Sequence, residues 1–485
     1  MAEYIPVIGL EVHAELQTHS KMFCGCPVVD STQASPNTAV CEICTGMPGT
    51  LPVINRRAVE FGMRVAAALH CTIAPVSVFA RKNYFYPDLP KGYQISQYEL
   101  PLAQHGWIAV QTECGSKKIR IRRVHLEEDT GKLIHADGYS LIDFNRSGVP
   151  LLEIVSEPDM HSVEEAKAYA SALRALVRYL GVNSGDMEKG VMRFEANISV
   201  RPADEDQLGT RSEVKNLNSF RAMEHAIAYE VQRQSALLDA GEEVLQQTMG
   251  WDEQNQQTYS QRSKEEAHDY RYFPEPDLPP LHLEPEWISS IESSLPELPA
   301  QKIDRYERDY GLSRYQASVI AQEKEVAAYF EEAVQAGDEI SAIAIANWLT
   351  GELFSLMNQT QTAMSAMPFS ANHLVELVKL VEEGTINQTT AKSILSAVFA
   401  TGQSPRAYVS EHDLAQVHDP ALLTKLIHAT LEHHPEQVQQ YLAGKIALQQ
   451  WFFGQVMRAA KGQANPTVLK ELLEKALLEL NDGRP

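Results

Sequence analysis

Apolar residues occupy every second position between residues 8 and 16 of the chain. A period of two predicts a β-strand with one buried face and one polar face. The polar face carries Glu11, His13 and Glu15 in a row, each about 7 Å from the next. Carboxylates and an imidazole aligned on a rigid strand are typical of a metal or acid–base site. A solvated strand face with incidental charges explains this row equally well.

The same alternation returns over residues 192–201 and predicts a second strand with a polar face. Further strands are predicted over 139–146 and 151–156, separated by a turn. A helix is predicted over 163–180, with Ser162 as its N-cap and Glu165 completing a capping box. The first half of the chain is therefore expected to be rich in β-structure with inserted helices.

Seven prolines fall between residues 274 and 299, and such a stretch is not expected in a helix or a central strand. We interpret it as the main domain boundary. Apolar residues beyond it follow helical spacing, and the last helix is predicted to begin with Asn465 as N-cap and Pro466 at its first position. The expected domains are 1–290, 291–403 and 404–485.

The chain has 485 residues and a formal charge of −22, with ordinary hydrophobic content. It contains no apolar run long enough to span a membrane and no signal peptide, so we expect a cytoplasmic protein. Nucleic-acid binding depends on local patches rather than on net charge. The basic segment 117–123 is one candidate patch, and a solvated strand face is its alternative interpretation.

Four of the six cysteines are grouped as Cys24-x-Cys26 and Cys41-x-x-Cys44, with fourteen residues between the pairs. Two close pairs separated by a turn-rich loop predict a four-thiolate zinc site in a zinc-ribbon insert near residues 24–44. The first pair is one residue shorter than the common spacing. Four protein ligands leave no open position on the metal, so the predicted zinc is structural.

Glu153 lies inside the apolar strand 151–156, where a lone carboxylate is costly unless it is paired or bound to a metal. An ion pair with an arginine is the structural interpretation. The functional one is a Mg²⁺ site that combines Glu153 with His13 and with Glu127 or Glu128. Periodicity does not settle which of these two glutamates turns into the site. The chain has no P-loop and no Rossmann glycine motif, so any bound nucleotide would depend on Mg²⁺ and on Lys or Arg side chains.

Segment 81–97 interleaves cations with aromatic residues. It suits stacking on a nucleotide or on a tRNA end, and packing on the protein's own surface explains it equally well.

The chain as a whole resembles the B subunit of the glutamyl/aspartyl-tRNA amidotransferase family. The resemblance rests on strings that occur in order from residue 7 to about 281, among them VIGLEVHAEL, CEICTGMPG, RKNYFYPDLPKGYQISQYE, HLEEDTGK, GVPLLEIVSEPD, MRFEANISVRP, EVKNLNSF and DYRYFPEPDLPPL. The helical remainder, with GQVM and KGQANP, resembles that family's YqeY-type tail.

The resemblance implies an α+β fold, in which a β-rich, glutathione-synthetase-like cradle domain precedes an all-α domain and a YqeY-like α tail that contact tRNA. It implies use of ATP and Mg²⁺ to phosphorylate Glu misacylated on tRNA(Gln), or Asp on tRNA(Asn), after which ammonia displaces phosphate. The ammonia would come from an amidase-type A subunit, with a small C subunit completing a heterotrimer.

Matched to the family motifs, His13, Glu128 and Glu153 would hold Mg²⁺, with Glu11 beside them near the phosphate or the ammonia entrance. Arg81 and Lys82 would bind phosphates of the nucleotide or the substrate. Two other functions remain open at this point: a tRNA-binding scaffold without catalysis, and a metal-dependent phosphoesterase that uses the same carboxylates.

Overall fold

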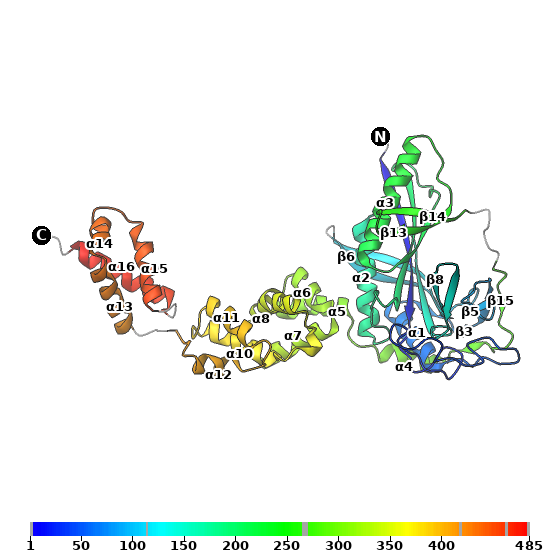
Figure 1. Ribbon diagram of the computed structural model, residues 1–485, viewed down its shortest axis with the longest axis horizontal. Helices are drawn as coiled ribbons and strands as arrows, with labels where there is room; N and C mark the ends of the chain where they lie inside the picture. The colour runs from blue at the N-terminus through cyan, green and yellow to red at the C-terminus, as the bar shows by residue number, and fades with distance from the viewer. Residues whose placement is uncertain (1–2, 113–114, 264–269, 417–419, 461–463, 483–485) are drawn as a thin grey trace. The chain divides into compact units, whose positions relative to one another are not determined.

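The computed structural model describes residues 3–112, 115–263, 270–416, 420–460 and 464–482. The chain divides into two compact units, Met1–Lys302 and Ile303–Pro485 (Figure 1). The first unit combines a large sheet with helices, and the labelled elements of the second unit are helices. The expected mixed first part and helical second part are therefore confirmed. Within the described residues, no helix combines the length and the hydropathy needed to cross a membrane.

A nine-stranded sheet forms the centre of the first unit, in the order β14-β13-β12-β11-β1-β10-β7-β6-β2. Neighbouring strands are antiparallel except for the parallel pair β12 and β13. The strands are β1 (Tyr4–Glu15), β2 (Thr72–Ile73), β6 (Ala103–Thr112), β7 (Gly115–Glu128), β10 (Pro150–Ser156), β11 (Met192–Pro202), β12 (Ser212–Leu217), β13 (Gln247–Asp252) and β14 (Gln257–Ser263).

The strands predicted over 8–16, 151–156 and 192–201 are confirmed as β1, β10 and β11, and they lie side by side in the middle of this sheet. The strand predicted over 139–146 is shorter, and it lies elsewhere. It forms β9 (Tyr139–Asp143), which pairs with β8 (Lys132–Ala136) in a separate two-stranded sheet.

Three helices cover the apolar face of the large sheet: α1 (Arg56–Ala68), α2 (Val163–Tyr179) and α3 (Phe220–Asp239). Helix α2 begins where it was predicted, since the Ser162 hydroxyl accepts from the Glu165 amide at 3.1 Å. The reciprocal half of the capping box is absent. The Glu165 carboxylate accepts from the His161 amide and from the Lys117 ammonium instead.

The apolar core between α1 and strands β7 and β10 depends on a close approach of the helix. Leu126 of β7 and Leu152 of β10 are fully buried, and both face Gly62 of α1. A Cβ on Gly62 would lie 2.6 Å from Leu102 Cδ2, 3.2 Å from Leu126 Cδ2 and 3.4 Å from Leu152 Cδ1. The glycine therefore lets the helix pack closely against β7 and β10.

The proline-rich stretch belongs to the first unit and contains short strands that pair with it. Strand β15 (Phe273–Pro274) joins β4 (Phe79–Asn83) and β5 (Tyr93–Gln97), while β16 (Leu281–His282) pairs with β3 (Val76–Ser77). The expectation that no helix occurs here is wrong. Helix α4 (Pro285–Ser293) begins with Pro285 at its first turn, where a missing N–H costs nothing, and Ile291 enters the core of the first unit.

The second unit contains two separate apolar clusters, one built around Tyr306, Phe330 and Phe369 and the other around Phe452 and Leu469. The predicted last helix is confirmed, because the Asn465 side-chain oxygen accepts from the Thr467 and Val468 amides at 3.0 and 3.2 Å. The helices are α5 (Pro299–Tyr310), α6 (Arg314–Ala321), α7 (Lys324–Ala336), α8 (Ala342–Trp348), α9 (Phe354–Thr360), α10 (Ala371–Glu382), α11 (Gln388–Val398), α12 (Pro405–Glu411), α13 (Pro420–His433), α14 (Pro435–Leu442), α15 (Leu448–Ala459) and α16 (Pro466–Asp482).

Replacing Gly62 with leucine is expected to lower the free energy of unfolding of the first unit by about 1–3 kcal/mol, because the added side chain overpacks the space between α1 and the sheet. Thermal or urea unfolding measures the loss. The matched control is Gly454→Leu in α15, where an added Cβ meets nothing within 4 Å. Equal stability of Gly62→Leu and wild type would contradict the close-approach argument.

Candidate active site

A row of polar side chains crosses three neighbouring strands of the large sheet. His13 of β1 lies directly opposite Glu153 of β10, and Glu153 lies opposite His125 of β7. Residues paired across strands place their side chains on the same face of a sheet. Strand pairing therefore gathers two imidazoles around one carboxylate, on the face opposite the leucine core.

Glu153 is the centre of this row. Its Oε2 atom lies 3.4 Å from His13 Nε2 and 3.3 Å from His125 Nε2. Glu127 completes the group, with its two carboxylate oxygens each 3.9 Å from one of the imidazoles. Arg123 lies farther away, 3.9 Å from the other oxygen of Glu153. Histidines, rather than an arginine, are thus the main partners of the buried Glu153.

Ligand atoms of His13, Glu127 and Glu153 all lie within 4.8 Å of one another, close enough to hold one metal ion. Carboxylates with one imidazole and open positions suit a hard cation that keeps water or phosphate ligands. We refer to these three residues as the His–Glu cluster.

The protonation of the cluster follows from its burial and its charges. Burial raises the pKa of Glu153, but the charges and hydrogen bonds of His125 and His13 hold that pKa well below its usual value. Burial lowers the pKa of His13, yet the hydrogen bond and charge of Glu153, with Glu195 and Glu127, raise it to about 9. The neighbouring carboxylates therefore favour the protonated, cationic form of His13.

Glu127 and Glu128, the two adjacent glutamates at the end of β7, have different side-chain partners. Glu127 accepts from the Ser96 hydroxyl at 3.1 Å and faces the cluster. Glu128 is paired with the Lys91 ammonium and accepts from the Ile95 amide at 2.9 Å. The structure therefore brings His13, Glu127 and Glu153 together and places the Glu128 carboxylate elsewhere. Strand alternation explains the result, since only Glu127 shares a face with His125.

Glu11 stands two residues from His13 and belongs to a second group. Its ligand atom lies within 4.8 Å of those of Glu195 and Glu213. Asn197 donates to Glu11 at 2.8 Å, and the Lys215 ammonium lies 2.9 Å from Glu195 and 3.2 Å from Glu213. Burial, followed by the charges of Glu153, Glu195 and Glu213, raises the pKa of Glu11. The negative field of the His–Glu cluster therefore extends along β1.

Arg81 and Lys82 are neighbours on β4 with different surroundings. The Lys82 ammonium lies 5.1 Å from the ring centre of Tyr270 and 5.9 Å from that of Tyr84. Burial lowers the pKa of Lys82, but the charges of Glu127, Tyr272 and Glu153 raise it above its usual value. Lys82 is thus a cation beside the His–Glu cluster.

Arg81 forms a bidentate ion pair with Glu275, with both N–O distances at 2.7 Å, and a third contact with Asp277 at 3.2 Å. The Glu275 side chain is fully buried. A guanidinium engaged in this way ties the proline-rich stretch to β4, which is a structural use of the residue.

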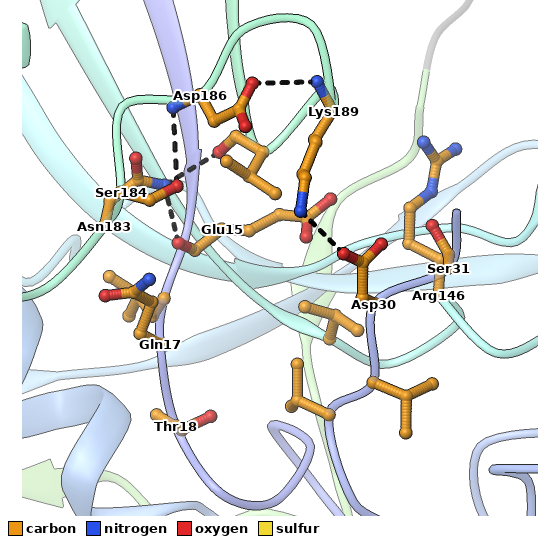
Figure 2. Close-up of a pocket in the computed structure, with 15 residues that line it drawn as sticks. Glu15, Gln17, Thr18, Asp30, Ser31, Arg146, Asn183, Ser184, Asp186 and Lys189 are labelled. Atoms are coloured by element: carbon orange, nitrogen blue, oxygen red, sulfur yellow. Dashed lines mark hydrogen bonds and ion pairs between the residues drawn. The ribbon is translucent and has the colours of Figure 1, made fainter. Parts of the chain in front are cut away.

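Glu15, the last residue of β1, lines a cavity of about 410 Å³ (Figure 2). Burial and the charge of Asp129 raise the pKa of Glu15 to about 8, against the opposing effects of Arg193 and Arg146. Figure 2 shows Arg146 and the Lys189–Asp30 ion pair, at 2.8 Å, in the wall of this cavity. The cavity is lined by Glu15 but not by His13, Glu127 or Glu153.

The sulfur atoms of Cys24, Cys26, Cys41 and Cys44 all lie within 4.8 Å of one another, and Cys41 and Cys44 are 4.0 Å apart. Zn–S bonds of about 2.3 Å in a tetrahedron require an S–S separation of about 3.8 Å, so the four thiols fit zinc. The pKa of Cys44 is lowered to about 4, chiefly by the hydrogen bond from Cys24. The Cys41 amide and the Lys21 charge lower this pKa further, whereas burial raises it.

The basic segment 117–123 is largely neutralised by acidic neighbours. Lys117 pairs with Glu165 at 2.8 Å, and the exposed Arg120 and Arg122 pair with acids at 2.6 and 2.8 Å. An ion-paired strand face accounts for this segment without nucleic acid.

Sequence analysis assigned no role to His125, although it lies two residues before Glu127, one of the two candidate metal ligands. The period of two places His125 and Glu127 on one face, and that was the available signal. Its significance depends on the pairing of β7 with β10, which no local pattern specifies.

Fold and site together define a protein with carboxylates and an imidazole, close enough to hold a cation, at the centre of a large sheet and beside a lysine. Residues 6–289 match the GatB/GatE catalytic domain, and residues 328–477 match the GatB domain. The chain belongs to the GatB family.

Three relatives show the extent of the likeness. Proteins from Thermodesulfovibrio yellowstonii, Persephonella marina and Thermomicrobium roseum are 49%, 47% and 50% identical to this chain. Each match covers 98% of this chain and 99–100% of the relative. Each relative is named as the B subunit of an aspartyl/glutamyl-tRNA(Asn/Gln) amidotransferase.

Replacing Arg81 with methionine is expected to destabilise the first unit by about 3–5 kcal/mol, because the buried Glu275 carboxylate loses its partner. Urea unfolding measures the change. The control Arg57→Met removes an exposed pair with Glu60 and should cost about 0.5 kcal/mol or less. A stable Arg81→Met protein with impaired ATP binding would instead favour a phosphate-binding role.

Proposed function

We propose that this chain activates the side-chain carboxylate of Glu misacylated on tRNA(Gln), or of Asp on tRNA(Asn), and converts it into an amide. Its family is that of the B subunits of tRNA-dependent amidotransferases, so the reaction class is ATP-dependent amide formation with glutamine as the nitrogen donor. The observation that carries the site assignment is the His–Glu cluster beside Lys82.

The chemistry explains why such a site is needed. A carboxylate is a poor electrophile because its negative charge repels nucleophiles. A carboxylate oxygen attacks the γ-phosphorus of ATP, ADP leaves, and an acyl phosphate forms. The ammonia nitrogen then attacks the carbonyl carbon, the C–O bond to phosphate breaks, and the amide forms with loss of a proton. Phosphoryl transfer depends on positioning and charge neutralisation more than on covalent help from the protein.

His13, Glu127 and Glu153 would hold Mg²⁺, with Glu127 in the place first expected for Glu128. The ion supplies charge neutralisation on phosphate oxygens. Lys82 would bind a phosphate or the substrate carboxylate, because it is a cation next to the cluster. Glu11 would lie beside the reacting groups, because it is two residues from His13 on β1 and the charges of Glu153 and Glu195 act on it.

The remaining assignments belong to the same proposal. Residues 1–290 would form the cradle domain, residues 291–403 a helical domain and residues 404–485 a YqeY-like tail, and the two helical parts would contact tRNA. The partners are an amidase-type A subunit and a small C subunit in a cytoplasmic heterotrimer. The four cysteines hold a structural zinc ion, which their sulfur separations support.

The test is amide formation on misacylated tRNA by the complex of this chain with its partner subunits, supplied with ATP and glutamine. Glu153→Gln and Glu127→Gln are each expected to lower the rate about a hundredfold or more, since each removes charge at the phosphates. Glu128→Gln should cost less than Glu127→Gln, and Glu157→Gln, just past the end of β10, serves as the control. The folded state of each variant is checked by circular dichroism.

Other results would assign other functions. Full activity of His13→Ala and Glu153→Ala would indicate a tRNA-binding scaffold. Phosphate release from model esters without glutamine or partner subunits would indicate a phosphoesterase. A larger loss for Glu128→Gln than for Glu127→Gln would return the metal ligand to Glu128.

Zinc removal gives a separate prediction. The purified chain is expected to contain one zinc ion, measured by plasma emission, and Cys44→Ser should contain much less. Loss of the ion should lower the melting temperature, because metal binding free energy contributes to folding free energy. The same melting temperature with and without a strong chelator would contradict a structural zinc.

A further inference from the structure

Lys21 is a lysine with no solvent exposure at all. Its ammonium donates to the Phe144 carbonyl at 3.2 Å and lies 3.5 Å from Cys44 Sγ. No carboxylate within the described residues forms an ion pair with it at 4 Å or less. Lys21 therefore differs from Lys82, whose charge is balanced by nearby glutamates.

A buried ammonium needs an anion, because removing a charge from water costs free energy that a neutral carbonyl does not return. The Cys44 sulfur, 3.5 Å away, supplies that charge as a thiolate, the form in which cysteine binds a metal. Four thiolates on one Zn²⁺ carry a net charge of −2, and Lys21 would reduce it to −1. The lysine thus offsets part of the negative charge of the metal-loaded site, through its contact with Cys44.

The same lysine lies at a junction between the cysteines and the candidate active site. The Ser147 hydroxyl donates to the Cys44 carbonyl at 2.9 Å, and the Met22 amide donates to the Gly148 carbonyl at 2.7 Å. The Gly148 amide in turn donates to the Asp129 carbonyl at 2.9 Å. Segment 144–149, which contains these contacts, is therefore held between the cysteines and the end of β7.

Gly148 shows how tight this junction is. Its φ is +82°, and an added Cβ would lie 3.3 Å from Cys44 Cβ and 3.6 Å from Lys21 Cδ. The segment then enters β10 at Pro150, three residues before Glu153. A displacement of the cysteines would be transmitted to the connection between the strands that carry Glu127 and Glu153.

We propose that Lys21 is the charge partner of the loaded four-cysteine site and that, through Lys21 and Cys44, the loaded site fixes segment 144–149 beneath the active site. Lys21 is a positioning residue in this arrangement. The proposal rests on the zinc assignment made under the proposed function. It adds a residue outside the ligand set and a structural consequence of metal loading.

The experiment compares Lys21→Met, which removes the charge, with Lys21→Arg, which keeps it. Lys167→Met, at an exposed lysine paired with Glu224, is the control. Zinc content and the rate of zinc transfer to a chromophoric chelator are measured on each full-length chain. Lys21→Met is expected to lower zinc affinity about ten- to a hundredfold, the usual effect of losing a partner of a metal ligand, and Lys21→Arg much less.

Hydrogen exchange gives the second readout. Chelation of the wild-type chain is expected to increase amide exchange over 144–149, and Lys21→Met should show that increase before chelation. If Lys21→Met does not fold, Lys21→Gln replaces it, since its amide keeps a hydrogen-bond donor in the side chain without the charge.

The outcomes separate the two proposals. A wild-type chain without zinc overturns the zinc assignment itself. A zinc-containing wild type, with Lys21→Met releasing zinc at the wild-type rate, overturns the role of Lys21 alone. Equal losses in Lys21→Met and Lys21→Arg would show that packing, not charge, matters, and would also overturn it. Unchanged exchange over 144–149 after chelation would overturn the link to the active site.

Discussion

The buried negative charge of Glu153 is the constraint on which the rest of the first unit depends. A carboxylate in the middle of a nine-stranded sheet is tolerated because His13 and His125, on the strands to either side, both reach one of its oxygens. A shift of one residue in either pairing would turn these imidazoles to the opposite face. The buried charge of Glu153 is therefore stable only in the observed register of β1, β10 and β7, and this favours that register over shifted ones.

The apolar face of the sheet fixes the same strands by packing. Leu126 and Leu152 alternate with Glu127 and Glu153 along their strands, and they pack against Gly62 of α1. Helix α1 thus packs on one face of these strands, and the His–Glu cluster lies on the opposite face. Outside the sheet, the cysteine-bearing segment and its Lys21 hold the connection that leads from β7 into β10.

The two neighbouring cations of β4 serve different purposes. Arg81 is held by a fully buried glutamate and an aspartate, so its charge is used to fasten the proline-rich stretch. Lys82, the next residue, faces the opposite way and lies near several acids without a close ion pair among the described residues. Proximity in sequence therefore says little about which cation is available for a phosphate.

Local pattern alone determined the strands β1, β10 and β11, the start of α2, the first turn of α16 and the cysteine grouping, because periodicity, capping and ligand spacing are properties of short segments. It also identified Glu153 as a charge that needs a partner. It left Glu127 and Glu128 unresolved, and it assigned no role to His125 or to Lys21. Those residues acquire their roles from the pairing of β7 with β10 and from the packing of segment 144–149 on the cysteines. Both are contacts between distant parts of the chain, whose free energy depends on the whole fold, so only the tertiary structure decided them.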